Sequence, residues 1–150
     1  AAVKNTQSVS EIDTSQYAAI FFPGGHGTMW DYPNNPELAK IITDALNAER
    51  VVAAVCHGPA VLVGVMDENG APLVKGRTVS AFTDSEEAAV GLTDAVPFLL
   101  ETKLRELGAN VQIAPDFEAL SVVDGLLVTG QNPASAKAVA ADVIKILKTK

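Results

Sequence analysis

Short apolar segments alternate with amphipathic ones along most of the chain. Unbroken apolar runs at 17–22 (YAAIFF) and 51–55 (VVAAV) predict strands buried on both faces, because a half-exposed strand would alternate apolar and polar positions. Shorter runs predict further strands at 77–82, 111–114 and 126–129. Residues 1–16, before the first of these strands, are polar and lack a clean period, so we expect an irregular lead-in there.

Amphipathic segments between the strands predict helices. The clearest spans 36–49, where Asn35 can cap the helix, Pro36 occupies its first turn and the apolar side chains share one face. Gly108 is placed to close another helix in the left-handed conformation. Further helices are predicted at 58–65, 97–107 and 134–147.

This alternation predicts one α/β domain over 1–150, with a mostly parallel sheet that helices cover on both faces. Strand 51–55 has the composition of a central strand, which needs a neighbour on each side. Domains of this kind usually begin with a central strand, whereas this chain begins with the polar lead-in. We therefore expect an upstream βα unit of the same protein outside these residues, as an N-terminal fragment or on a second chain.

Charge and cysteine content narrow the class of protein. The chain carries 18 acidic and 11 basic side chains, a formal net charge of −7, which argues against a nucleic-acid partner or an anionic membrane surface. The single cysteine, Cys56, excludes an internal disulfide framework and fits a reducing compartment. No apolar run reaches the roughly 20 residues of a membrane-spanning helix. We expect a cytoplasmic globular protein.

Cys56 is the strongest chemical signal. It directly follows the apolar strand at 51–55 and precedes His57, Gly58 and a predicted helix. A strand, a tight turn with a nucleophile and a helix form the elbow that raises a nucleophile above the carboxyl ends of a parallel sheet. The N-terminus of the helix would favour the thiolate, and His57 could carry a proton. A small core cysteine is the alternative interpretation.

Two further loops follow predicted strands and so reach the same edge of the sheet. Loop 23–27 (PGGHG) contains three glycines whose backbone N–H groups could hold a developing oxyanion, although an ordinary glycine-rich loop has the same composition. Segment 82–87 (FTDSEE) contains three carboxylates, one of which could orient a histidine. The same acids suit the first turn of a helix, and their spacing does not choose among them.

Together these motifs resemble the ThiJ/PfpI superfamily of class I glutamine-amidotransferase-like folds. The closer resemblance is to its branch of glutathione-independent glyoxalase III enzymes and heat-shock chaperones. It extends from about residue 17 to the end of the chain, and its two most specific stretches, CHGP and NPAS, are specific only in combination. The matching segments are 22–27 (FPGGHG), 31–33 (DYP), 54–59 (AVCHGP), 76–77 (GR), 82–84 (FTD) and 127–135 (LVTGQNPAS).

The resemblance implies a flavodoxin-like three-layer α/β sandwich that lacks its N-terminal strand in this chain. It implies Cys56 as the nucleophile, His57 as its partner and Glu87 as the acid that completes the triad, with Glu86 as the alternative. Members of this branch also place a glutamate from the first βα turn beside the sulfur. That turn would precede residue 1, so no residue of this chain is assigned to it.

The resemblance also implies a reaction and its requirements. Gly24, Gly25 and His26 would form the oxyanion and substrate-binding loop. The implied enzyme is a glyoxalase III-type lyase (D-lactate dehydratase) that converts a small dicarbonyl, methylglyoxal, to lactate without a metal or cofactor, and we expect a homodimer. A cysteine-dependent peptidase or amidase and a stress chaperone without essential catalysis are the alternatives.

Overall fold

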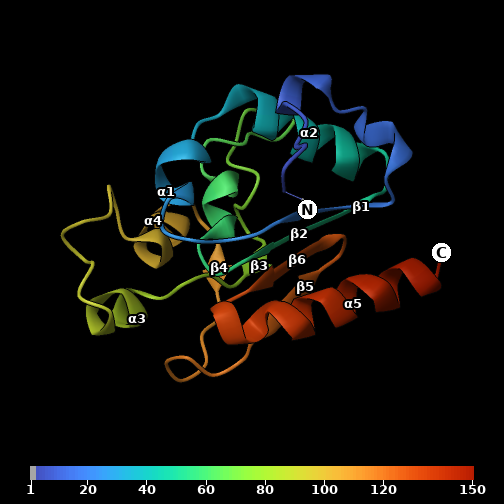
Figure 1. Cartoon of the computed structure of the whole chain (residues 1–150). Helices are drawn as coiled ribbons and strands as arrows, with labels where there is room; N and C mark the ends of the chain where they lie inside the picture. The colour runs from blue at the N-terminus through green and yellow to red at the C-terminus, as the bar shows by residue number, and fades with distance from the viewer. Residues whose placement is uncertain (1–2) are drawn as a thin grey trace.

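Four strands in the order β1-β2-β6-β5 form the sheet at the centre of the protein (Figure 1). The computed structural model describes residues 3–150. β1 (Ala19–Phe22), β2 (Val51–Val55) and β6 (Leu127–Gly130) are parallel, while β5 (Ser121–Asp124) runs antiparallel along one edge. The predicted α/β fold with a mostly parallel sheet is confirmed, and β2 is a central strand as expected.

The two longest helices cover opposite faces of this sheet (Figure 1). α2 (Pro36–Asn47) begins as predicted, because the side-chain oxygen of Asn35 accepts hydrogen bonds from the N–H groups of Glu37 and Leu38. α5 (Ala136–Lys148) closes the chain on the other face. Sheet and helices therefore form the three layers of a sandwich.

Two apolar cores lie between these layers, and β2 contributes to both. Val52 and Ala54 pack in the core that includes α2, whereas Val51, Ala53 and Val55 pack in the core that includes α5. All five side chains are buried. Because both faces of β2 are covered, its sequence is a continuous apolar run with no alternation.

A second, two-stranded parallel sheet pairs β3 (Thr78–Val79) with β4 (Asn110–Val111). Both strands are shorter than predicted, since 77–82 and 111–114 were each expected to be fully extended in a ladder. After β3, the N–H of Ser80 donates to the hydroxyl of Thr129 in β6, and the N–H of Phe82 donates to the carbonyl of Cys56. These bonds hold the segment without extending the ladder.

Two other local predictions need correction. The segment after Cys56 is a short 3-10 helix, η3 (Gly58–Leu62), and not a helix that reaches residue 65. It ends because the backbone is extended at Val63 and left-handed at Gly64, where φ is 92°. The edge strand β5 is absent from the predicted elements, because its short sequence SVVD shows no clear apolar run.

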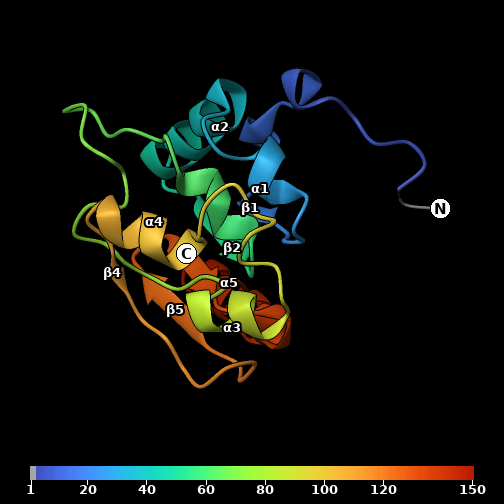
Figure 2. The same ribbon diagram turned by 90° about the vertical axis from the view of Figure 1, so that its left-hand side faces the viewer.

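The remaining elements are short, and two of them surround the ends of the central strands. In the view of Figure 2, α1 and α3 lie on either side of the ends of β1 and β2. Gly108 takes the left-handed conformation that was predicted to close α4 (φ 91°). These elements are η1 (Val9–Glu11), η2 (Thr14–Gln16), α1 (Thr28–Asp31), α3 (Asp84–Ala89), α4 (Leu100–Glu106) and η4 (Pro133–Ser135).

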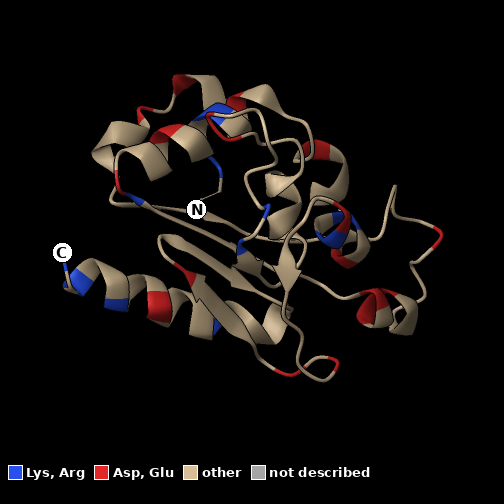
Figure 3. Cartoon of the chain, turned by 180° about the vertical axis from the view of Figure 1, so that it is seen from behind, with Lys and Arg blue, Asp and Glu red and all other residues tan. Residues whose placement is uncertain are grey.

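Charged residues lie mainly on the outer helices and loops (Figure 3), and β1, β2 and β6 contain none. Over residues 3–150, no helix is long and apolar enough to cross a membrane. In that same described range, Glu86 and Glu87 are the only Asp, Glu, Lys or Arg residues that are buried. Two adjacent buried carboxylates are costly unless each is hydrogen-bonded or paired, so they direct attention to α3.

Candidate active site

Cys56 follows β2 in a left-handed backbone conformation, with φ of 63°. Its N–H donates to the carbonyl of Gly130 and its carbonyl accepts from the N–H of Phe82, each over 2.9 Å. A side chain in this conformation costs about 1–2 kcal/mol. Such strain persists only where the surroundings fix it, as these two hydrogen bonds do here. The tight turn predicted after β2 is present.

Two glycines let the loops that carry the site touch backbone to backbone. A Cβ atom on Gly58 would lie 2.3 Å from the carbonyl oxygen of Phe22. A Cβ atom on Gly24 would lie 2.9 Å from the Cβ of Cys56. Neither position admits a larger residue without a backbone shift, so the loop after β1 and the turn after β2 fit together only as they are.

Cys56, His57 and Glu87 form a continuous hydrogen-bonded chain. The Cys56 Sγ lies 3.4 Å from His57 Nδ1, and His57 Nε2 lies 2.7 Å from Glu87 Oε2. The imidazole and the carboxylate are both almost fully buried. The three residues that were predicted as a triad are therefore brought together, with the acid on α3 and the other two at the end of β2.

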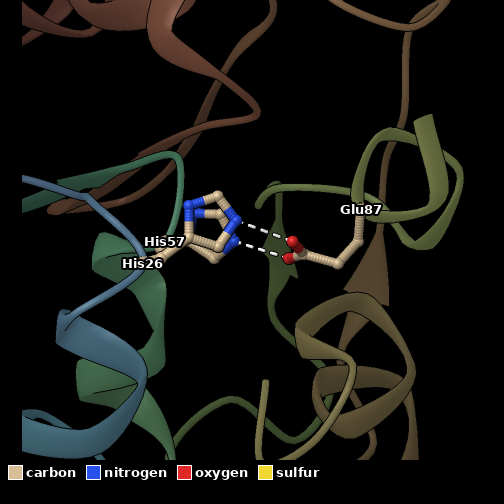
Figure 4. Close-up of side chains that lie close together, drawn as sticks. All are labelled: His26, His57 and Glu87. Atoms are coloured by element: carbon tan, nitrogen blue, oxygen red, sulfur yellow. Dashed lines mark hydrogen bonds and ion pairs between the residues drawn. The ribbon is translucent and has the colours of Figure 1, made fainter. Parts of the chain in front are cut away.

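His26 also contacts this carboxylate, which the sequence did not predict. Its Nε2 lies 2.6 Å from Glu87 Oε1, so the two oxygens of Glu87 each bind one histidine (Figure 4). The two imidazole rings lie 4.1 Å apart, centroid to centroid. His26 was expected to bind substrate; it lies in the loop after β1 and lines the cavity, but its ring is held by Glu87.

Burial governs the protonation of the sulfur and of its partner ring. It raises the pKa of Cys56 to about 11, although hydrogen bonds from the backbone of His57 and Gly25 act in the opposite direction. It also lowers the pKa of His57, against the hydrogen bond to Glu87. Burial therefore opposes the thiolate that the end of the following helix was expected to favour. At neutral pH the pair consists of a thiol and a neutral imidazole.

The neutral pair has a defined arrangement of protons. As a carboxylate, Glu87 only accepts hydrogen bonds, so the Nε2 atom of His57 must be the donor. The Nδ1 atom then has a free lone pair, and it is this atom that faces Cys56. The imidazole is thus set to remove the thiol proton as the sulfur attacks, which is general-base activation rather than a standing thiolate.

Glu86 points away from the histidines and binds a different set of groups. Its Oε2 accepts from the backbone N–H and the hydroxyl of Thr83, and its Oε1 accepts from Phe117, Gln131 and Asn132. Burial alone would raise its pKa, but these hydrogen bonds outweigh it and hold the pKa below the ordinary value of 4.5. Of the two candidate acids, only Glu87 touches the cysteine–histidine pair.

A cavity of about 430 Å³ opens over the sulfur. Gly24, Gly25 and His26 line it together with Cys56 and His57, so the predicted loop residues do face the predicted nucleophile. Two phenylalanines also line the cavity, Phe82 with its ring 4.3 Å from that of His57, and Phe117 with its ring 6.2 Å from that of Phe82. Neither was predicted as a site residue: Phe82 belongs to the matching segment 82–84, but an aromatic residue in a loop is usually a packing residue.

The histidine pair and Glu87 are also close enough to share a metal ion, since one donor atom of each lies within 4.8 Å of the others. Both imidazoles already bond to the carboxylate, at 2.6 and 2.7 Å, so a cation would have to displace two short hydrogen bonds. The arrangement as it stands is suited to moving protons.

Comparisons with known proteins identify the family to which the chain belongs. The family model of the DJ-1/PfpI family matches residues 1–146. Glyoxalase 3 of Candida albicans is 40% identical over 95% of this chain and 63% of its own length. A probable glutathione-independent glyoxalase of Schizosaccharomyces pombe, hsp3104, is 38% identical over 99% of this chain and 69% of its own length.

Solved structures give the same result. The Rapid Encystment Protein 24 KDa of Francisella tularensis superposes with a TM-score of 0.92 at 40% identity, over 95% of this chain and 63% of that one. The chain thus spans about two thirds of the length of the proteins it matches. Family model, relatives and fold together establish that the chain belongs to the DJ-1/PfpI family.

Proposed function

We propose that the chain carries the catalytic machinery of a glutathione-independent glyoxalase, which converts methylglyoxal to lactate with Cys56 as nucleophile. The observation that carries the proposal is the hydrogen-bonded chain from sulfur through imidazole to carboxylate, at 3.4 and 2.7 Å. The names of the two relatives, Glyoxalase 3 and probable glutathione-independent glyoxalase, support it. Because the chain spans only part of those proteins, the activity of the whole protein is inferred.

The first step is attack on the aldehyde. The sulfur of Cys56 bonds to the aldehyde carbon while the thiol proton passes to His57 Nδ1. The aldehyde oxygen becomes an alkoxide, which accepts hydrogen bonds from backbone N–H groups of the cavity and then takes that proton. The product is a hemithioacetal. Backbone N–H groups of His57 and Gly25 already act on the sulfur and lower its pKa, so such donors lie at the reacting atom.

The second step moves hydrogen between two carbons. The proton on the former aldehyde carbon leaves to a base, and its electron pair forms an enediol with the neighbouring carbonyl carbon. Return of a proton to that neighbouring carbon gives a thioester of lactate on Cys56. Water then hydrolyses the thioester and restores the thiol. One carbon is oxidised and the other reduced, so no external oxidant or cofactor is needed.

The deciding experiment is methylglyoxal consumption with lactate detection on the purified protein, beside Cys56→Ala. We expect lactate from the wild type and none from the variant, with both proteins folded by thermal melting. Full turnover by Cys56→Ala would contradict the nucleophile. Cleavage of peptide substrates without dicarbonyl consumption would favour a peptidase. Suppression of client aggregation by both proteins, without lactate, would favour a chaperone.

A further inference from the structure

His26 occupies a position that the mechanism above leaves unused. It lies in the loop after β1, lines the cavity over Cys56 and keeps 35% of its side chain exposed, while His57 is fully buried. The carboxylate of Glu87 fixes both rings from one side (Figure 4). A second imidazole at this place is not needed to orient the first, because His57 has its own oxygen of Glu87.

The shared carboxylate determines where each ring can accept a proton. Glu87 as a carboxylate only accepts, so with neutral rings both Nε2 atoms must donate to it. Both Nδ1 atoms then have free lone pairs. In Figure 4 the Nε2 atoms of both rings point to Glu87, and the other ring nitrogens lie on the far side of the rings. In this arrangement the two rings lie side by side, with centroids 4.1 Å apart, and each has its Nδ1 atom turned away from Glu87.

The proposed reaction moves two different protons, one between oxygens and one between carbons. His57 Nδ1 lies 3.4 Å from the sulfur, so it can take the thiol proton and serve the hemithioacetal hydroxyl, which is two bonds from that sulfur. The carbon-bound proton is on the former aldehyde carbon, which is bonded to the sulfur. Its base must therefore approach that carbon from the cavity. His26 is the other imidazole that lines this cavity, and its ring centroid lies 4.1 Å from that of His57.

We propose that His26 is a second catalytic base, which transfers the carbon-bound proton while His57 serves the sulfur and the oxygens; this rests on the proposed function. The C–H bond of the hemithioacetal carbon breaks, its proton goes to His26 Nδ1, and its electron pair forms the enediolate. His26 then returns that proton to the neighbouring carbon. His57 moves the hydroxyl proton from the first oxygen to the second, so both rings end neutral.

The test separates proton transfer from packing. His26→Gln keeps an amide N–H that can donate to Glu87 but offers no base. We expect its kcat for methylglyoxal to fall about 100-fold or more with little change in KM. The rate at which iodoacetamide alkylates Cys56 should stay within about twofold of wild type, since His57 is untouched. Lys40→Gln, on the exposed face of α2, is the control and should match wild type in both assays.

A second variant and an isotope test complete the design. His26→Ala leaves space at a partly exposed position, and added imidazole should restore turnover in it but not in Cys56→Ala. Methylglyoxal deuterated at the aldehyde carbon should react more slowly than the protonated substrate, and by a larger factor in His26→Gln than in wild type. A structural role for His26 alone would predict neither result.

The outcomes distinguish the two proposals. Wild-type activity with a His26→Gln kcat within about threefold of wild type would overturn the role of His26 and leave the glyoxalase proposal standing. A His26→Gln variant that lost turnover and iodoacetamide reactivity together would also overturn it, because the loss would then arise at the cysteine. No lactate from wild type, with Cys56 still alkylated normally, would overturn the proposed function itself.

Discussion

Glu86 and Glu87 are adjacent, both buried, and both on the first turns of α3, yet they belong to different parts of the molecule. Glu86 accepts five hydrogen bonds from backbone, hydroxyl and amide donors, none of which carries a charge. Glu87 binds two imidazoles that line or adjoin the cavity. Neighbouring positions on a helix point about 100° apart, so one turn of α3 supplies two separate networks.

The contrast shows what fixes the role of a buried carboxylate. Amide and backbone donors cannot take up or release a proton near neutral pH, so the Glu86 network only holds segments together. It ties α3 to the loop at Phe117 and to Gln131 and Asn132, which follow β6. Imidazoles can exchange protons, so the Glu87 network can take part in chemistry. Four substitution and pH experiments test this division.

Glu87→Gln should have the largest effect, and on activity. A glutamine presents one acceptor and one NH₂ donor, so one of the two histidines meets a donor and must switch tautomer. If that ring is His57, its Nδ1 carries a hydrogen and cannot take the thiol proton. We expect kcat to fall by about 100- to 10,000-fold, measured as lactate formation. Retention of more than about a tenth of the wild-type kcat would place the essential acid elsewhere.

Glu86→Gln should act on stability instead. Its NH₂ group would face two or more of the donors that now bind Glu86, which leaves buried donors without acceptors. We expect a loss of about 2–4 kcal/mol in the free energy of unfolding, measured by urea titration with Trp30 fluorescence. The folded fraction should keep its activity within about tenfold. The comparison breaks if Glu87→Gln proves the less stable of the two variants.

The free energy of unfolding should depend on pH in the way that the lowered pKa of Glu86 requires. Its folded-state pKa lies below 4.5, so the unfolded chain takes up the proton first as pH falls. The stabilisation is complete above about pH 4.5 and is lost as pH drops through the lowered pKa. Unfolding free energies of wild type and Glu86→Gln from pH 7 to 3 should converge toward low pH. A constant difference across that range would contradict the assignment.

The smallest difference between the two variants should appear in the pKa of Cys56, which the charges of Glu86 and Glu87 both raise. Burial is the main cause of its raised pKa of about 11, and the charges of Glu86 and Glu87 each add to it. Both Glu→Gln variants should therefore move the pH midpoint of Cys56 alkylation slightly downward from that of wild type. The readout is the rate of iodoacetamide reaction, measured over a pH range that extends to both sides of this pKa. An upward shift in either variant would show that charge is not the common cause.

Much of the fold could be predicted because buried segments have a recognisable apolar pattern in the sequence. The run 51–55 indicated a strand covered on both faces, and Asn35 with Pro36 marked the start of α2. The failures occur where side chains replace regular structure. β3 ends early because the residues after it donate to the hydroxyl of Thr129 and to the carbonyl of Cys56. Such long-range contacts cannot be predicted from the local sequence.

The predicted site residues lie together in the structure, but only some of the contacts between them could be predicted. Residues 56 and 57 are adjacent in sequence, so their pairing could be inferred, and the resemblance chose Glu87 over Glu86. The contact between His26 and Glu87 joins positions 61 residues apart, one in the loop after β1 and the other on α3. The protonation of the sulfur also escaped prediction, because it depends on burial, which a helix-end argument does not measure.

The left-handed backbone at Cys56 has a consequence for how this position would change over generations. Glycine adopts that conformation without penalty and asparagine with little, so the backbone at this position gives selection for folding no reason to keep cysteine there. A population selected for growth in the presence of a reactive dicarbonyl should keep it without exception. Sequencing position 56 after drift under each regime would measure directly how strongly catalysis, rather than folding, maintains this residue.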